Sequence, residues 1–163
     1  MNSINLIKKG KKILMQKGIP SSTLDSELIL ANLFNFTKEK ILTQCIDNIS
    51  NSKVEKFKND IIRRSKFEPI AYIINKREFW KNEFYIQKGA LIPRPETELL
   101  VEESLKHLSN KNSLILEIGV GSGCVLLSIL KDLSKSRGIG IDISKSAIKI
   151  AKKNSKILGL DRR

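Results

Sequence analysis

The stretch LEIGVGSGC, residues 116–124, decides the fold of this chain, because it joins the end of an apolar strand to a glycine-rich turn and the start of a helix. Gly119, Gly121 and Gly123 alternate with other residues in it. Glycine has no Cβ, so such a turn can be tight and its backbone can approach a ligand closely. Backbone N–H groups at the start of the following helix can meet negative charge. The stretch therefore predicts a ligand-binding turn between a strand and a helix.

Apolar runs on both sides of this turn predict alternating strands and helices. Residues 114–118 form a short apolar strand, a helix through Leu126 follows the turn, and residues 138–142 form a second strand. Ser144 can cap a last helix and Gly159 can end it. A β-α-β-α order is typical of a parallel sheet in a doubly wound α/β domain.

The first seventy or so residues predict a small helical bundle. Apolar stripes indicate three of its helices, through Ile4, Ile7 and Leu14, through Leu24, Leu28 and Ala31, and through Val54, Phe57 and Ile61. Thr37 can cap another helix, and Ser52 with Glu55 matches a capping box. Pro69 ends the region.

Residues 77–93, REFWKNEFYIQKGALIP, differ in composition from the bundle because they are rich in aromatic residues. We expect a β-hairpin or an extended linker here, with turns offered by Asn82 and by Lys88–Gly89. Pro95 then suits the first turn of a further helix.

Three residues around the glycine turn discriminate between ligands. Asp142 ends the second strand about twenty residues beyond the turn, where a carboxylate can accept hydrogen bonds from both ribose hydroxyls of an adenosine. A pyrophosphate-binding turn needs glycine or alanine at the sixth position of G-x-G-x-x-G, and here that position is Cys124. Glu117 before the turn suits the cationic amino-acid end of S-adenosylmethionine better than a pyrophosphate. The pattern favours S-adenosylmethionine over a nicotinamide dinucleotide; a structural turn with a solvated Asp142 is the remaining alternative.

The amino-acid composition says less about the binding partners of the chain than the glycine turn says about its ligand. The net charge of +13 favours acidic partners such as nucleic acid, yet the lysines are scattered and no aromatic residues interleave with them as a stacking platform requires. Direct nucleic-acid binding is therefore not favoured, although it stays open.

No apolar run approaches the roughly 20 residues of a membrane span, and the N-terminus does not read as a signal peptide, so we expect a cytoplasmic protein without a membrane partner. Cys45 and Cys124 lack metal-ligand spacing, so we expect free thiols and no metal site.

Two further stretches, RRSKFEPIAYIINKREFW at residues 63–80 and LIPRPETELLVE at residues 91–102, resemble the HemK/PrmC family. That family consists of N5-glutamine methyltransferases that modify peptide chain release factors at the glutamine of a Gly-Gly-Gln loop. The resemblance implies an α/β fold with a helical substrate-docking bundle at residues 1–74, a β-hairpin linker at 75–92, and the start of a class I, Rossmann-like methyltransferase domain at 93–163. It also implies S-adenosylmethionine as cofactor and release factors as partners, and we expect a monomer.

Carried over residue by residue, the resemblance assigns a donor site. The family's donor loop falls on Gly119, Val120, Gly121, Ser122 and Gly123. Its ribose-binding acid falls on Asp142, and Glu117 stands at the acidic position before the turn. The PRPETE run lies near the donor pocket in the family, so Arg94 and Glu96 are candidate neighbours of the site; an equal alternative is that they only stabilise the start of a helix. A related family that methylates a ribosomal protein lacks the PETE run, which favours release factors.

The chain also departs from the family's pattern. It contains no Asn-Pro-Pro-Tyr loop, the family's catalytic signature, and two parallel strands are too few for a stable open sheet. We therefore expect the N-terminal portion of a longer enzyme, with no catalytic residue in this chain and no activity by itself. Two alternatives stay open: a non-catalytic helical module that binds a release factor or ribosomal partner, and a methyltransferase that acts on another protein or on a nucleic-acid amino group.

Overall fold

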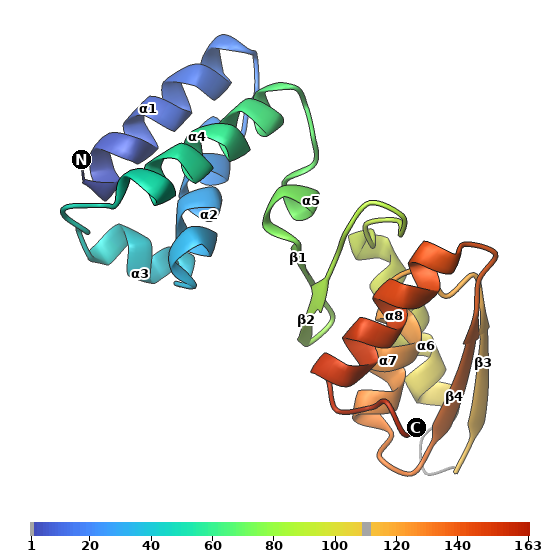
Figure 1. Cartoon of the computed structure of the whole chain (residues 1–163). Helices are drawn as coiled ribbons and strands as arrows, with labels where there is room; N and C mark the ends of the chain where they lie inside the picture. The colour runs from blue at the N-terminus through green and yellow to red at the C-terminus, as the bar shows by residue number, and fades with distance from the viewer. Residues whose placement is uncertain (1, 109–111) are drawn as a thin grey trace. The chain divides into compact units, whose positions relative to one another are not determined.

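A computed structural model describes residues 2–108 and 112–163 of the chain, which divide into two compact units, up to Ile74 and from Asn75 onward (Figure 1). Helices come first and the short strands follow, so the predicted α/β class is confirmed. No helix within the described ranges is both long enough and apolar enough to span a membrane.

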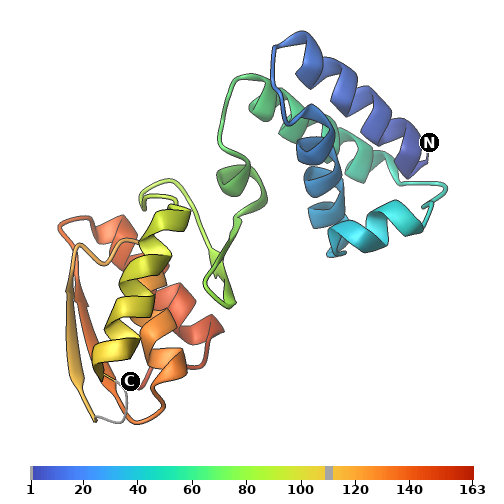
Figure 2. The same cartoon turned by 180° about the vertical axis from the view of Figure 1, so that it is seen from behind.

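The described part of the first unit is helical. Its helices are α1 (Ser3–Gln16), α2 (Ser22–Phe34), α3 (Lys38–Thr43), α4 (Asn51–Ser65) and α5 (Ile70–Ile74). α1, α2 and α4 lie side by side (Figures 1 and 2). Their buried aliphatic and aromatic side chains, among them Leu6, Leu14, Ile29, Leu30, Phe57 and Ile61, form one continuous core. The predicted stripe of Val54, Phe57 and Ile61 on α4 is confirmed as a buried face.

Gly10 lies where α1 meets α2 and α4. A Cβ at this position would come within 2.9 Å of Phe57 Cζ, Ile61 Cδ1 and Ser26 Oγ. Glycine within a helix costs roughly 1 kcal/mol relative to alanine, so its presence here is explained by the close approach of the helices. The buried face of α1 consequently runs through Leu6, Gly10 and Leu14.

Two arginines at the end of α4 are fixed by carboxylates. Arg64 Nε donates to Asp25 Oδ2 of α2 at 2.7 Å, and the Asp25 side chain is buried. Arg63 binds Glu68 with two nitrogens, Nε to Oε2 at 2.9 Å and Nη2 to Oε1 at 2.8 Å. Bidentate arginine–carboxylate pairs have restricted geometry, so these contacts fix the end of α4 against α2 and the following loop.

Some predicted details of the first unit are wrong. Ile4 and Leu24 are exposed, because they lie outside the buried faces of their helices. The buried residues are Ser3, Leu6, Gly10 and Leu14 in α1 and Ser22, Asp25, Ser26, Ile29, Leu30 and Ala31 in α2. The capping box is also wrong: α4 begins at Asn51 after Ser50, so Ser52 lies inside its first turn. The cap at Thr37 is confirmed, since Thr37 Oγ1 accepts the Lys40 N–H at 3.2 Å.

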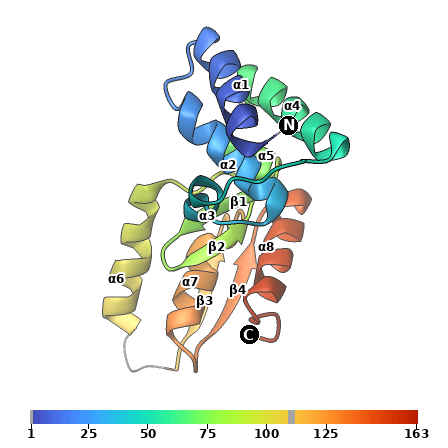
Figure 3. The ribbon, with the colours of Figure 1, turned by 90° about the vertical axis from the view of Figure 1, so that its left-hand side faces the viewer.

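The second unit holds a hairpin and a parallel pair of strands. Its elements are β1 (Lys76–Phe79), β2 (Asn82–Tyr85), the 3-10 turn η1 (Pro95–Thr97), α6 (Glu98–Leu108), β3 (Leu114–Ile118), α7 (Cys124–Asp132), β4 (Arg137–Ile141) and α8 (Lys145–Ile157). β1 and β2 are antiparallel, while β3 and β4 are parallel and lie side by side (Figure 3). α6, α7 and α8 lie on one face of the β3–β4 pair (Figures 1 and 2). The predicted strand at 114–118 and the helix capped by Ser144 are confirmed.

Two glycines of β4 allow the covering elements to pack directly on the strand backbone. A Cβ at Gly138 would lie 2.7 Å from Leu126 Cδ1 of α7, and one at Gly140 would lie 2.7 Å from Val120 Cγ2. The helix-covered face of β4 is therefore glycine, and its isoleucines lie on the other face.

The hairpin turns at Trp80 and Lys81, just before the predicted turn residue Asn82, which begins β2 instead. The turn predicted at Lys88–Gly89 is confirmed. Trp80 has φ 55°, a left-handed conformation that is strained for a bulky residue. Its backbone N–H donates to Glu98 Oε1 at 2.7 Å and its indole N–H to Asp132 Oδ2 at 3.0 Å. These acceptors come from α6 and α7, so tertiary contacts select the turn.

We expect Gly10→Val to destabilise the helical unit by about 2 kcal/mol, because the added carbons overpack the crossing of α1, α2 and α4. Hydrogen–deuterium exchange read by mass spectrometry measures this, since peptides from these helices report the first unit separately. Lys9→Val on the exposed side of α1 is the control. Equal exchange in the two variants would contradict the close packing at Gly10.

Candidate functional site

The glycine turn connects β3 to α7 at the carboxyl end of the parallel strands, which is where α/β sheets bind ligands. The backbone N–H groups of Gly119 and Val120 both donate to the Ile141 carbonyl, at 2.8 and 2.9 Å, and so attach the turn to β4. Gly119, Gly121 and Gly123 have φ values of 77°, 55° and 82°. A side chain at any of the three would be strained, so the turn requires glycine at these positions.

Asp142 lies directly after β4 and holds the turn from the other side. Its Oδ1 accepts the Ser144 N–H at 2.8 Å, and its Oδ2 accepts the Gly121 N–H at 2.9 Å. The hydrogen bonds from Ser144 and Gly121 hold the pKa of the Asp142 carboxyl below its ordinary value. Each carboxylate oxygen can accept a second hydrogen bond. An ionised carboxylate with spare acceptor capacity therefore lies beside the glycine turn.

Glu117 lies in β3 and its carboxylate reaches the start of α7. Its Oε2 accepts the Leu126 N–H at 3.0 Å. Gly123 is the N-cap of α7 and has no side chain to accept such a donor, so Glu117 supplies the capping oxygen from the preceding strand. Burial raises the pKa of the Glu117 carboxyl to about 7, although the Leu126 hydrogen bond lowers it. A cation beside this group would favour its ionised form.

The side chains within the turn are buried and face the protein. Val120 packs over Gly140, and Ser122 Oγ lies 2.8 Å from Cys124 Sγ. Burial raises the pKa of the Cys124 thiol to about 12, so this cysteine remains protonated and is a poor nucleophile. Cys124 and Cys45 are both free thiols, as expected.

Asn154 of α8 is a part of this site that the sequence analysis missed. Its side chain is fully buried, and Nδ2 donates to the Ser122 carbonyl at 2.8 Å and to the Tyr85 carbonyl at 2.9 Å. Its Oδ1 accepts the Tyr85 N–H at 2.8 Å. One amide therefore links the turn, β2 and α8. The signal was an asparagine that shares the inward face of α8 with Ala147 and Ile150.

The PRPETE run contains Arg94 and Glu96, the two residues that the resemblance makes candidate neighbours of the site. Arg94 and Glu96 are exposed, and within the described residues neither side chain makes a hydrogen bond to the glycine turn. Glu98 instead binds the Trp80 N–H and so connects the start of α6 to the hairpin. The sequence analysis also did not single out Arg77, whose Nε is buried without a hydrogen-bond partner among the described residues.

Comparison with known proteins shows what the chain is similar to. Residues 5–74 match the PrmC N-terminal domain. The chain is 37% identical over 160 residues to the release factor glutamine methyltransferase of Leptospira interrogans, a match that covers 96% of this chain and 56% of that protein. The enzyme of the same name from Caulobacter vibrioides is 34% identical over 94% of this chain and 53% of its own length. The enzyme of the same name from Buchnera aphidicola subsp. Schizaphis graminum is 40% identical, over 83% of this chain and 50% of its own length.

The chain thus spans about half the length of the curated relatives it matches. The resemblance drawn from residues 63–80 and 91–102 is confirmed.

We expect Asn154→Leu to destabilise the second unit by about 3 kcal/mol, because the Ser122 carbonyl and both main-chain groups of Tyr85 would be buried without partners. Urea unfolding followed by fluorescence measures it, since Trp80 is the single tryptophan of the chain and lies in this unit. Lys152→Leu on the exposed side of α8 is the control. Equal midpoints for the two variants would contradict the linking role of Asn154.

The pKa of Glu117 predicts a pH dependence of stability. Between its ordinary value of 4.5 and about 7 the folded chain keeps a proton that the unfolded chain has lost, so this group's contribution to stability falls as the pH rises through that window. Glu117→Gln cannot ionise. We expect it to raise the free energy of unfolding, relative to the parent, by about 2 kcal/mol more at about pH 8 than at about pH 5. A difference independent of pH in Trp80-monitored unfolding would refute this assignment.

Proposed function

We propose that this chain is a member of the PrmC family and carries the methyl-donor part of a release factor glutamine methyltransferase, as its similarity to the PrmC N-terminal domain and to enzymes of that name supports. The reaction would transfer the methyl group of S-adenosylmethionine to the side-chain amide nitrogen of the glutamine in a release factor's Gly-Gly-Gln loop. The observation that carries the proposal is the ionised Asp142 carboxylate, hydrogen-bonded to Gly121 in a turn that needs three glycines. A protein that modifies release factors would be located in the cytoplasm.

The space around the turn supports a donor at this position. A Cβ built on Gly119 would meet no atom within 4 Å, and one on Gly121 would meet only the Gly119 carbonyl oxygen, at 3.9 Å. These two glycines are therefore not required by packing inside the protein, and their backbone is open to a ligand. We infer that the turn forms the floor of the donor pocket in a class I, Rossmann-like domain.

Each carboxylate has a proposed task in donor binding. Asp142 would accept hydrogen bonds from the two ribose hydroxyls through its remaining lone pairs. Glu117 would face the ammonium group of the donor, which would favour its ionised form. Val120 and Ser122 would contribute backbone to the pocket, while their buried side chains hold the turn in place. Arg94 and Glu96 stay candidates for its outer edge.

Orienting the substrate amide requires a part of the enzyme that is not among these 163 residues. An amide nitrogen is a poor nucleophile, so catalysis depends on aligning it with the methyl group and polarising the amide by hydrogen bonds. The 163 residues contain no Asn-Pro-Pro-Tyr sequence, the family's means of holding the amide. We infer that this chain supplies the donor site and that the helical unit docks the release factor, and we name no catalytic residue in it.

We expect the 163-residue chain to bind S-adenosylmethionine more weakly than micromolar and to lose that binding when Asp142 is replaced. Ligand-observed NMR at high donor concentration should give a signal for the parent that falls about tenfold in Asp142→Ala, because the ribose loses a charged acceptor. Asp161→Ala, which removes an exposed carboxylate elsewhere in the unit, is the control.

An unchanged signal in Asp142→Ala would overturn the proposed ribose contact. Micromolar binding by the unmodified chain would overturn the expectation that these 163 residues bind the donor only weakly.

A further inference from the structure

Helix α8, whose sequence is KSAIKIAKKNSKI, carries five lysines and no acidic residue. Four of the lysines, Lys145, Lys149, Lys152 and Lys156, are exposed and follow one another at spacings of four, three and four residues. With about 3.6 residues per helical turn, these spacings place all four within about 60° of the helix circumference. We call these four residues the lysine stripe.

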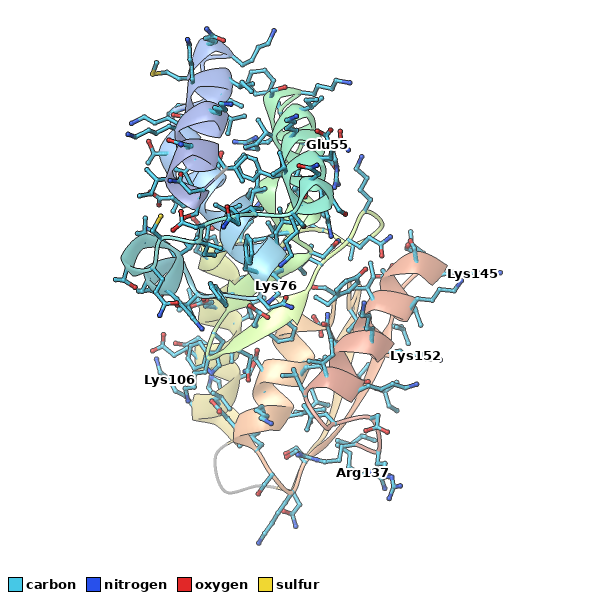
Figure 4. The ribbon with its side chains drawn as sticks, turned by 60° about the vertical axis from the view of Figure 1, so that its left-hand side comes forward. Glu55, Lys76, Lys106, Arg137, Lys145 and Lys152 are labelled. Carbon is cyan, nitrogen blue, oxygen red and sulfur yellow. The ribbon has the colours of Figure 1, made fainter. Side chains whose placement is uncertain are left out.

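The lysine stripe lies opposite the face by which α8 packs on its unit. The buried residues of α8 are Ala147, Ile150 and Asn154, and these lie about half a helical turn away from the stripe. Lys145 and Lys152 both project outward from the helix (Figure 4). A rise of about 1.5 Å per residue extends the stripe over about 16 Å. The helix therefore gathers into one line charges that are spread along the sequence.

Carboxylates do not neutralise the lysine stripe. Within residues 2–108 and 112–163, none of its four lysines forms an ion pair. Other helices differ, since Lys106 of α6 contacts Glu102 and Glu103, and Lys58 of α4 contacts Glu55 (Figure 4). Like charges three or four positions apart destabilise a helix, so the stability of α8 does not explain the stripe.

Lys153, the fifth lysine of α8, lies beside the stripe but has a partner. Its Nζ lies 3.2 Å from the centroid of the Tyr85 ring, where the electrons of the ring attract a cation. This contact fixes Lys153 on the hairpin strand β2. No lysine of the stripe has such a contact with a described aromatic ring. The stripe is thus a set of four charges held by the helix backbone and left for a partner.

The chemistry of the stripe indicates which kind of anionic partner it suits. The exposed residues of α8 from Lys145 to Lys156 are all lysine or serine. Protein–protein interfaces are depleted in lysine and enriched in aromatic residues, methionine and arginine. Lysine binds phosphate as a point charge, and contacts to phosphates hold a nucleic acid without reading its bases. A line of phosphates therefore suits the stripe better than an acidic protein surface.

The charge of the chain and its few aromatic residues agree with contact to a nucleic-acid backbone alone. The net charge of +13 attracts a polyanion over a distance. The exposed residues of the stripe include no aromatic ring on which a base could stack, so sequence preference is not expected.

We propose that the lysine stripe of α8 is a docking surface for the phosphate backbone of a nucleic acid, which it binds without sequence preference. The contact is independent of methyl transfer, because no residue of the candidate donor site belongs to the stripe.

The test uses the 163-residue chain and a fluorescein-labelled single-stranded RNA, with binding measured by fluorescence anisotropy at several salt concentrations between about 50 and 200 mM. Four phosphate contacts predict a slope of about −3 for the logarithm of the affinity against the logarithm of the salt concentration. Lys149→Gln together with Lys152→Gln should halve this slope and weaken binding at least about tenfold at the lowest salt, because two contacts are lost. Glutamine and lysine have similar helix propensities, so α8 should remain folded.

Two control variants separate the stripe from the total charge. Lys12→Gln together with Lys66→Gln removes the same charge from two exposed lysines of the first unit. Lys149→Arg together with Lys152→Arg keeps the charge of the stripe. Both controls should keep the slope of the parent and bind the RNA within about threefold of it.

Three outcomes would overturn the proposal. The first is an equal loss of affinity in the two glutamine variants, which would mean that binding follows total charge. The second is the absence of salt-dependent binding to the RNA. The third is tighter, stripe-dependent binding of labelled poly-glutamate than of RNA, which would assign the stripe to an acidic protein.

Discussion

The second unit depends on one buried amide. Asn154 links the glycine turn, the hairpin strand β2 and helix α8 through three hydrogen bonds to main-chain groups of Ser122 and Tyr85. Both of its amide donors and its carbonyl oxygen are used, so the group is buried without an unsatisfied polar atom. Because two of these elements lie far from α8 in sequence, the amide determines where the turn stands relative to the hairpin and thereby shapes the candidate site.

Local patterns were sufficient for much of this fold. Strand β3 matches its predicted range, and the caps at Thr37 and Ser144 lie where the sequence indicated, since capping involves residues three positions apart. Features set by distant residues escaped prediction. The hairpin turns at Trp80 because Glu98, eighteen positions along the chain, accepts its N–H. Gly10 gives no hydropathy signal, although it decides which face of α1 is buried.

The candidate site likewise contains some residues that local sequence patterns indicated and others that depend on distant residues. The glycines of the turn and Asp142 were predicted because each is marked by its spacing from a strand end, and in the structure the Asp142 carboxylate accepts the Gly121 N–H. The capping contact of Glu117 with α7 was not predicted, since the acid reads from sequence as a ligand contact alone. Asn154 was overlooked because its partners are 32 and 69 positions away. Long-range polar contacts of this kind leave almost no local trace.

Leu116, Ile118, Ile139 and Ile141 form an exposed aliphatic row on β3 and β4, and this row bears on the lifetime of the chain in a cell. Exposed leucines and isoleucines beside unpaired strand edges are what chaperones bind and what promotes aggregation when concentration rises. A chain whose row stays uncovered is therefore exposed to chaperone capture and proteolysis, while a chain whose row is covered is protected. The persistence of this chain in a cell should consequently depend on whether the row is covered.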